Sequence, residues 1–172
     1  MSVKSAIARY EGTGLRFKVR TGSGHEIVVD NKEGDAGPRP AELVVVAHAG
    51  CTAMDVISIL QKKRQNVTAY EVQINAVQRD DPAPNVFLTS DVLHVVEGQG
   101  IDEAAVRRAI ELSATKYCSV GATLAAGTVE VHHRYRIVGP AGTQPVEGEV
   151  LVTGPHADPD VVATGAGASK AS

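Results

Sequence analysis

Two cysteines are the residues of this chain best suited to covalent chemistry. Cys51 lies in an apolar run, with His48 three residues before it and Asp55 four residues after it. Residues with these spacings share one face of a helix, so we expect the three side chains to lie together. A reactive Cys51 would need a neighbour that stabilises its thiolate, because burial alone disfavours the charged form. The alternatives are a packed thiol that acts as a small hydrophobe and a core histidine at position 48.

Cys118 lies at an expected break between two helices, close to Ser119. If Ser119 begins a new helix, the first backbone N–H groups point toward the sulfur of Cys118 and favour its thiolate. The alternative is a packed thiol at a kink. A separation of 67 residues from Cys51 allows a disulfide but does not establish one.

Other catalytic motifs are absent from the sequence. It contains no Gly-x-Ser-x-Gly elbow, no Walker loop, no dinucleotide-binding glycine pattern and no Cys-x-x-Cys pair. His132 and His133 are a poor metal site, because adjacent residues of a strand point to opposite faces. Two cysteines are too few for a disulfide scaffold or for a zinc site made of thiolates alone. We therefore expect no metal and no cofactor, and any disulfide in a reducing compartment would be transient and catalytic.

Composition and charge indicate a globular protein. The chain has 172 residues, of which 43% are hydrophobic and 22% charged, and a net charge of -3. The charge, and aromatic residues at only 3% with no Trp, argue against nucleic-acid binding. Residues 1–9 lack the apolar core of a secretory signal. Residues 41–60 are long enough to span a membrane, but Glu42, His48 and Asp55 would be costly there, so we predict a buried central helix in a cytoplasmic protein.

The pattern of elements predicts an α+β domain with the order β-β-β-α-β-β-α-α-β. Alternating and glycine-bounded runs predict strands, and apolar runs with capping residues predict helices. The predicted strands cover residues 3–9, 15–20, 25–30, 70–76, 86–96 and 129–137. The first predicted helix runs from Pro40 to about residue 64. The second begins at the N-cap Asp102 and runs through Leu112 to a break at 116–119, and a short helical segment then follows to residue 126.

The domain is predicted to cover residues 1–139, and residues 140–172 are predicted to form a largely flexible C-terminal extension. Residues 149–153 could add one edge strand. Residues 155–172 are rich in Ala, Gly, Asp and Ser, which is typical of a flexible tail.

Several segments together resemble the OsmC/Ohr family (osmotically inducible protein C and organic hydroperoxide resistance protein). Residues 37–43 and 50–60 resemble the central helix of that family, and residues 112–120 resemble its second cysteine motif. Residues 15–30 are similar to its N-terminal hairpin. The resemblance covers residues 3–138 and is closest to the YhfA-like branch.

The resemblance implies a fold and an activity. The fold would be a curved antiparallel sheet packed on long central helices, in an intertwined homodimer with two active sites. The activity would be that of a thiol-dependent peroxidase in oxidative stress defence. Cys51 would reduce an organic hydroperoxide and become a sulfenic acid, and Cys118 would condense with it to form a disulfide. A dithiol such as a lipoylated protein would then reduce that disulfide.

The resemblance also implies a carboxylate and a guanidinium at the site. In the family's peroxidases, a Glu directly after the helix-opening Pro pairs with an Arg that steers the thiolate and the peroxide. Here that position holds Ala41, and the carboxylate is one place later, at Glu42. A shift of one residue rotates a helical side chain by about 100°. Arg16 is the first candidate for the partner, before Arg20 and Arg39, so the predicted site is Cys51, Cys118, Glu42 and Arg16.

Two other functions remain open on the same fold. One is a different thiol chemistry, such as sulfur or acyl transfer, with His48 as the base that activates Cys51. The other is a non-enzymatic apolar-ligand binder or stress-associated dimer, in which both cysteines are packing residues.

Overall fold

The computed structural model describes residues 2–127 and 129–154, and the chain divides into two compact units, Met1–Val46 and Ala47–Ser172. Helix α1 (Pro40–Lys62) begins in the first unit and continues into the second. Pro40 stands at its first position, where a missing N–H group is not needed. The predicted α+β class is confirmed.

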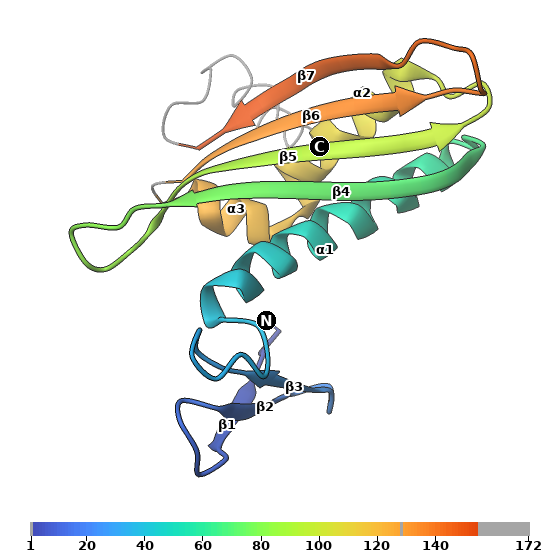
Figure 1. Ribbon diagram of the computed structural model, residues 1–172. Coiled ribbons are helices and arrows are strands. Elements are labelled where there is room, and N and C mark those ends of the chain that lie inside the picture. The colour runs from blue at the N-terminus through green and yellow to red at the C-terminus, as the bar shows by residue number, and fades with distance from the viewer. Residues whose placement is uncertain (1, 128, 155–172) are drawn as a thin grey trace, which may run out of the picture. The chain divides into compact units, whose positions relative to one another are not determined.

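The first unit contains a three-stranded antiparallel sheet in the order β1-β2-β3 (Figure 1). Its strands are β1 (Ala6–Tyr10), β2 (Phe17–Thr21) and β3 (Glu26–Val29), and each of them overlaps a region predicted to be a strand. The rings of Tyr10 and Phe17 lie across the β1–β2 pair from each other, with their centroids 5.5 Å apart and their planes tilted by 47°.

The second unit contains a four-stranded sheet in the order β4-β5-β6-β7. Its strands are β4 (Val67–Gln78), β5 (Phe87–Gly98), β6 (Glu130–Val138) and β7 (Val146–Thr153). β5 and β6 run parallel, so the antiparallel arrangement that the family resemblance implies is wrong for this pair. Parallel neighbours need a long crossover, and the helical segments between these two strands provide it.

The crossover consists of α2 (Glu103–Leu112), the π-helical turn η1 (Ser113–Tyr117) and α3 (Ser119–Ala125). Together with the later part of α1 it covers one face of the four-stranded sheet (Figure 1). The main core lies between these layers and is formed by apolar residues of α1, α2, β5 and β6: Val56, Leu60, Val96, Val106, Ala109, Ile110, Tyr135 and Ile137. Burial of such side chains is the principal driving force for packing the helices on the sheet.

Two boundary predictions at the crossover are confirmed. Asp102 caps α2, because its side chain accepts a hydrogen bond from the backbone N–H of Ala104 at 3.0 Å. The helix breaks where expected, at Cys118, which has an extended backbone and is the N-cap of α3. Both features come from local residue types that compete with continued helix.

β7 extends the sheet beyond the predicted domain end at residue 139. The predicted edge strand at 149–153 is present but begins earlier, at Val146, and pairs with β6. This part of the predicted C-terminal extension therefore belongs to the sheet. The predicted flexible tail, residues 155–172, lies outside the described residues.

Helix α1 is less buried than its composition predicts. In the single chain only one stripe of it is buried, formed by His48, Thr52, Val56 and Leu60. Met54, on the other side, is 74% exposed. By length and composition α1 also qualifies as a membrane span, a test that core helices of soluble proteins pass as well. The all-round apolar character of α1 is thus not explained by packing within one chain.

Three buried histidines lie under the four-stranded sheet. His48 of α1, His94 of β5 and His133 of β6 are each at most 2% exposed, and each has a ring nitrogen with no partner among the described residues. The hydroxyl oxygen of Tyr70 lies 2.7 Å from Nδ1 of His94, within hydrogen-bond distance. Burial, together with the charge of His48, lowers the pKa of His94 to about 3. Burial and the charges of His94 and His48 likewise lower the pKa of His133 to about 3. These rings are therefore neutral near pH 7.

The neutral histidines should make the fold sensitive to acid. The folded pKa of His133 is below its ordinary value of 6.5, so the unfolded chain binds the proton more readily as pH falls below that value. The free energy of unfolding should decrease by up to about 1.4 kcal/mol per pH unit for each such histidine. His133→Phe should remove one of these contributions and flatten the slope, as measured by urea unfolding at about pH 6 and about pH 5. His25→Phe, at an exposed site, is the control and should leave the slope unchanged.

Candidate active site

Helix α1 carries one half of the site. Cys51 is half-buried, and Asp55 lies one turn further along the same face. Thr52, next to Cys51, is fully buried on the stripe that faces the crossover. The predicted grouping of Cys51 and Asp55 on one helix face is confirmed by their sulfur and carboxylate positions.

The break between η1 and α3 carries the other half. In η1 the chain makes one π-helical turn, closed by a hydrogen bond from the Cys118 N–H to the carbonyl oxygen of Ser113 at 2.8 Å. This wider turn ends the helix and leaves Cys118 with an extended backbone at the start of α3. The thiol of Cys118 is 3% exposed. π-Helical turns of this kind are frequent at functional sites.

The two halves meet at the sulfurs. The Sγ atoms of Cys51 and Cys118 and a carboxylate oxygen of Asp55 all lie within 4.8 Å of one another. Both cysteines are free thiols. The sulfur pair is thus close enough for a disulfide to form after a small side-chain movement.

A short chain of hydrogen bonds holds Asp55 in place. The hydroxyl of Ser113 donates to Oδ2 of Asp55 at 3.1 Å. A hydroxyl has one proton, so the buried contact of 3.0 Å between Thr52 and Ser113 has Thr52 as its donor. This chain connects α1 to η1 and directs the carboxylate of Asp55 toward the two thiols.

The electrostatic environment differs from the prediction for Cys118. As predicted, an N–H group of the new helix points at the sulfur: Gly121 donates to Sγ at 3.3 Å. This contact lowers the pKa of Cys118, but burial raises it by more, and Cys51 and Asp55 raise it further. Cys118 is therefore a protonated thiol near neutral pH, and the expected stabilisation of its thiolate is outweighed by burial.

His48 is buried close to this site but does not contact Cys51 as a base would. Its Nδ1 lies 3.4 Å from the hydroxyl of Ser90, and its Nε2 has no hydrogen-bond partner among the described residues. Burial lowers the pKa of His48. No hydrogen bond joins His48 to Cys51 in the described part of the chain, so the geometry gives no support to a Cys–His pair.

Arg16 and Glu42 lie in the first unit, where each has another partner. Nε of Arg16 is 3.4 Å from the buried carboxylate of Asp30. Glu42 accepts hydrogen bonds from the backbone N–H of Arg39 at 2.8 Å and from its guanidinium at 3.2 Å. Arg39, the last of the three arginine candidates, is therefore the partner of Glu42. The roles of Arg16 and Glu42 toward a peroxide stay predictions.

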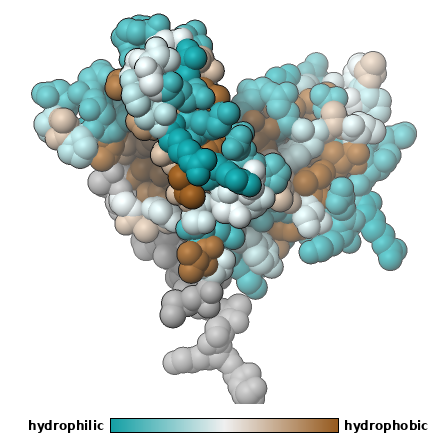
Figure 2. Space-filling view, turned by 90° about the horizontal axis from the view of Figure 1, so that it is seen from below, coloured by the Kyte–Doolittle hydropathy of each residue, from teal (hydrophilic) through white to brown (hydrophobic). Residues whose placement is uncertain are grey.

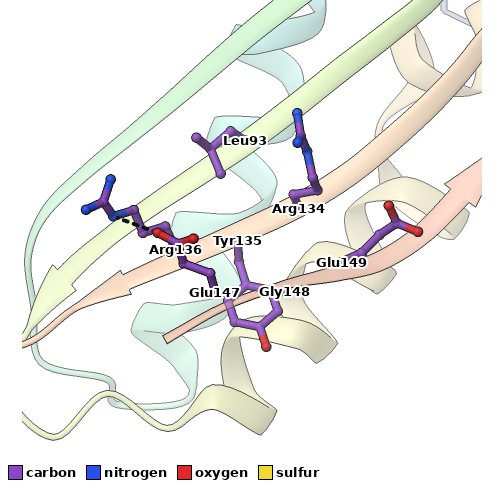
Figure 3. Close-up of a pocket in the computed structure, with 7 residues that line it drawn as sticks. All are labelled: Leu93, Arg134, Tyr135, Arg136, Glu147, Gly148 and Glu149. Atoms are coloured by element: carbon purple, nitrogen blue, oxygen red, sulfur yellow. Dashed lines mark ion pairs between the residues drawn. The ribbon is translucent and has the colours of Figure 1, made fainter. Parts of the chain in front are cut away.

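A separate groove lies on the solvent-facing side of the four-stranded sheet and has a volume of about 520 Å³ (Figure 3). It is lined by residues of β5, β6 and β7: Leu93, Arg134, Tyr135, Arg136, Glu147, Gly148 and Glu149. Its two arginines are already neutralised, because Arg136 pairs with Glu147 and Arg134 with Asp91. Neither cysteine lines the groove, so it is not the site of thiol chemistry.

The structure adds three residues to the predicted site: Asp55, Thr52 and Ser113. Asp55 was predicted to share the helix face but not to act, and Thr52 and Ser113 were not singled out. A signal exists in the sequence, since Ser113 is a polar residue in the last turn of an otherwise apolar helix face. The opposite orientation of His132 and His133 is confirmed: His132 pairs with Glu130 near the surface, and His133 is buried.

The family is shown by comparison with known proteins. Residues 32–134 match the model of the OsmC-like protein family. This chain therefore belongs to the OsmC-like family. It is 43% identical to protein YhfA of Escherichia coli K12 over 125 residues, which cover 73% of this chain and 92% of YhfA. YhfA of Shigella flexneri matches to the same extent.

Solved structures support the same fold. A hypothetical protein from Aquifex aeolicus VF5 is 28% identical, with a TM-score of 0.70, and the match covers 81% of this chain and 98% of that one. The organic hydroperoxide resistance protein OhrB of Bacillus subtilis is 15% identical, with a TM-score of 0.54 over 78% of this chain and 98% of that one. At that identity the similarity to OhrB shows the fold alone.

The hydrogen-bond chain of the site can be tested by removing its middle member. Ser113→Ala should lower the free energy of unfolding by about 1–3 kcal/mol, because the buried hydroxyl of Thr52 then loses its acceptor and Asp55 loses its donor. Thr52→Val combined with Ser113→Ala should cost less than the sum of the single changes, since no buried hydroxyl is then left unpaired. Urea unfolding under reducing conditions measures both. Additive losses would contradict a coupled chain.

Proposed function

We propose that this protein is a thiol-dependent peroxidase that reduces organic hydroperoxides in oxidative stress defence. The observation that carries the proposal is the approach of the two free sulfurs, Cys51 and Cys118, to within 4.8 Å of each other. A sulfenic acid escapes further oxidation when a second thiol is this close to it. Membership of a family whose fold is shared by proteins named for organic hydroperoxide resistance supports the same chemistry.

The different burial of the two thiols supports a different role for each of them. Cys51 is half-buried and can meet a substrate that enters from solvent, whereas Cys118 is almost completely buried. Burial also raises the pKa of Cys118, so that it is a poor first nucleophile. Cys51 is therefore proposed as the attacking residue and Cys118 as the resolving one.

The cycle has three steps. The Cys51 thiolate attacks one peroxide oxygen, the O–O bond breaks, and the products are the Cys51 sulfenic acid and an alkoxide that takes up a proton to become an alcohol. The Cys118 sulfur then attacks the Cys51 sulfur, the S–O bond breaks, and the thiol proton leaves with the hydroxide as water. A dithiol reductant, such as a lipoylated protein, finally reduces the disulfide by thiol–disulfide exchange.

Asp55 is the carboxylate nearest to the resolving step. Its oxygen lies within 4.8 Å of both sulfurs, and Ser113 holds it there. A carboxylate in this position can take the proton of Cys118 as the S–S bond forms and pass it to the departing hydroxide. This role would explain how a thiol that burial keeps protonated can still close the disulfide.

Arg16 and Glu42 are proposed, as the family resemblance implies, to steer the peroxide at the attacking thiol. The alternative of sulfur or acyl transfer with His48 as base is less favoured, because His48 bonds to Ser90 instead of Cys51. The alternative of a non-enzymatic binder requires sulfurs too far apart to bond, which the separation of at most 4.8 Å does not favour. A cytoplasmic location suits the two free thiols.

The working form is proposed to be a homodimer. Met54 of α1 is 74% exposed in the single chain, and Figure 2 shows further apolar surface between hydrophilic regions of the viewed face. Large exposed apolar side chains on a long apolar helix are typical of an interface. In a symmetric dimer the α1 helices would cover each other, since the same surface serves both copies.

The proposed cycle predicts distinct behaviour for the two cysteine variants. With dihydrolipoamide as reductant, the wild-type protein should consume cumene hydroperoxide, and Cys51→Ser should lose this activity. Cys118→Ser should reduce one equivalent and then stall with a sulfenic acid that dimedone traps. Glu97→Gln, at an exposed strand position, should keep wild-type rates. An inactive wild-type protein, or an active Cys51→Ser variant, would refute the proposed function.

The dimer can be tested by placing a charge in the proposed interface. Met54→Lys should raise the dissociation constant of the dimer at least about tenfold, because a lysine ammonium would be desolvated there. Val77→Lys replaces a residue that is 54% exposed on β4, and it should leave the dimer unchanged. Sedimentation velocity over a range of protein concentrations measures both. Equal behaviour of the two variants would remove α1 from the interface.

A further inference from the structure

The cluster around the thiols brings together groups that can carry negative charge, and in the described part of the chain no salt bridge joins any of them to a cation. Cys51, Asp55 and Cys118 each carry a negative charge when they are deprotonated. Gly121 donates its N–H group to the Cys118 sulfur, whereas the charges of Cys51 and Asp55 disfavour the thiolate of Cys118. Two sulfurs and one carboxylate oxygen within 4.8 Å of one another are a set of donor atoms that a cation can share.

We propose that the reduced site binds one thiophilic divalent cation, with Zn²⁺ as the best match, through the sulfurs of Cys51 and Cys118 and the carboxylate of Asp55. Two thiolates alone are too few for a zinc site, but a carboxylate is an ordinary third zinc ligand. The set of two sulfurs and one oxygen also selects against Mg²⁺ and Ca²⁺, which prefer oxygen ligands throughout.

The geometry is close to what zinc requires. With Zn–S bonds of about 2.3 Å and tetrahedral angles, two coordinating sulfurs stand about 3.8 Å apart. The three donor atoms already lie within 4.8 Å of one another, so contraction by about an ångström would complete the site. Side-chain rotation at Cys51, which is half-buried, can supply such a shift without moving the core.

The surroundings of the three donors resemble the outer shell of a metal site. Ser113 donates a hydrogen bond to Oδ2 of Asp55, which orients the carboxylate. Gly121 donates its N–H to the sulfur of Cys118. Hydrogen bonds of this kind orient the first ligands of metal sites and tune their affinity.

His48 offers a fourth donor atom if its ring moves, since it is not among the residues whose donor atoms lie within 4.8 Å of one another. Its Nε2 is buried and has no partner among the described residues, while Nδ1 faces Ser90. A histidine that binds a metal commonly hydrogen-bonds through its other nitrogen in this way. A Cβ atom at position 121 would lie 3.0 Å from Nε2 of His48 and 3.3 Å from the sulfur of Cys118. Gly121 therefore keeps open the space between these two donor atoms.

Metal binding and disulfide formation exclude each other. Both need the same two sulfurs, and a disulfide has no thiolate to offer. If the proposed peroxidase function holds, Zn²⁺ would inhibit the cycle by occupying the reduced pair and would also protect Cys51 from over-oxidation. This regulatory consequence rests on the proposed function, whereas the binding of the cation does not.

The test is a metal titration of the reduced full-length chain in the absence of any hydroperoxide. Zn²⁺ affinity is measured by competition with a chromogenic chelator, and proton release is followed in weak buffer. Cd²⁺ reports the sulfur ligands through thiolate-to-metal charge-transfer absorption, and Co²⁺ reports tetrahedral geometry. We expect one cation per chain, release of the thiol protons and no binding by the protein with a closed disulfide.

Ligand variants identify the donor atoms. Cys51→Ser and Cys118→Ser should each lower Zn²⁺ affinity by more than about 100-fold, and Asp55→Asn and His48→Gln should each lower it by roughly 10–100-fold. Glu97→Gln and His25→Gln, at exposed positions, should bind as the wild type does. Circular dichroism verifies that each variant is folded, and Asp55→Glu should retain part of the affinity if Asp55→Asn does not fold.

Two outcomes would overturn the site. One is the absence of a stoichiometric Cd²⁺ charge-transfer band from the reduced wild-type protein. The other is wild-type affinity in Asp55→Asn, since two sulfurs alone would then hold the metal. The titration uses no hydroperoxide, so it tests metal binding even if the protein has no peroxidase activity. A titration without metal binding, in turn, does not contradict the proposed peroxidase function.

Discussion

The buried hydrogen bond between Thr52 and Ser113 is the contact on which the site depends. It joins residues 61 positions apart and fixes α1 against the π-helical turn η1. Cys51 precedes Thr52 directly, and Cys118 ends the turn that Ser113 begins. With these anchors in place the two sulfurs and Asp55 have little freedom to separate. The hydrophobic core on either side makes the helices pack, and this polar contact selects the register in which they do so.

The two thiols of the site differ in properties because their surroundings in the fold differ, and not because of their neighbours in the sequence. Neither cysteine has a histidine or arginine bonded to its sulfur among the described residues. Cys51 keeps access to solvent, whereas Cys118 is enclosed by the crossover and stays protonated. The difference between two chemically identical thiols thus arises from burial, which has the largest influence on the pKa of Cys118.

The sequence predicts the fold well because its signals are local. The alternation in β4 and β6, the capping by Asp102 and the break before Ser119 each follow from neighbouring residue types. Long-range features did not follow from these signals. The parallel β5–β6 pair and the division into two units depend on how segments far apart in the chain meet. The partners of Ser113 likewise lie on another helix, so its role could not be predicted. The pairing of Arg39 with Glu42, in contrast, is a local contact across three residues at the start of α1, which a comparison with family motifs does not reveal.

The π-helical turn η1 has a consequence for how such a site can arise. A π-helical turn contains one residue more than an α-helical turn, and each residue advances a helix by about 100°. Deletion of one residue from Ser113–Tyr117 would restore a regular helix and rotate everything after it, so that Cys118 would face away from Cys51. The pairing of the cysteines thus depends on the length of chain between Ser113 and Cys118 as well as on which residues stand there.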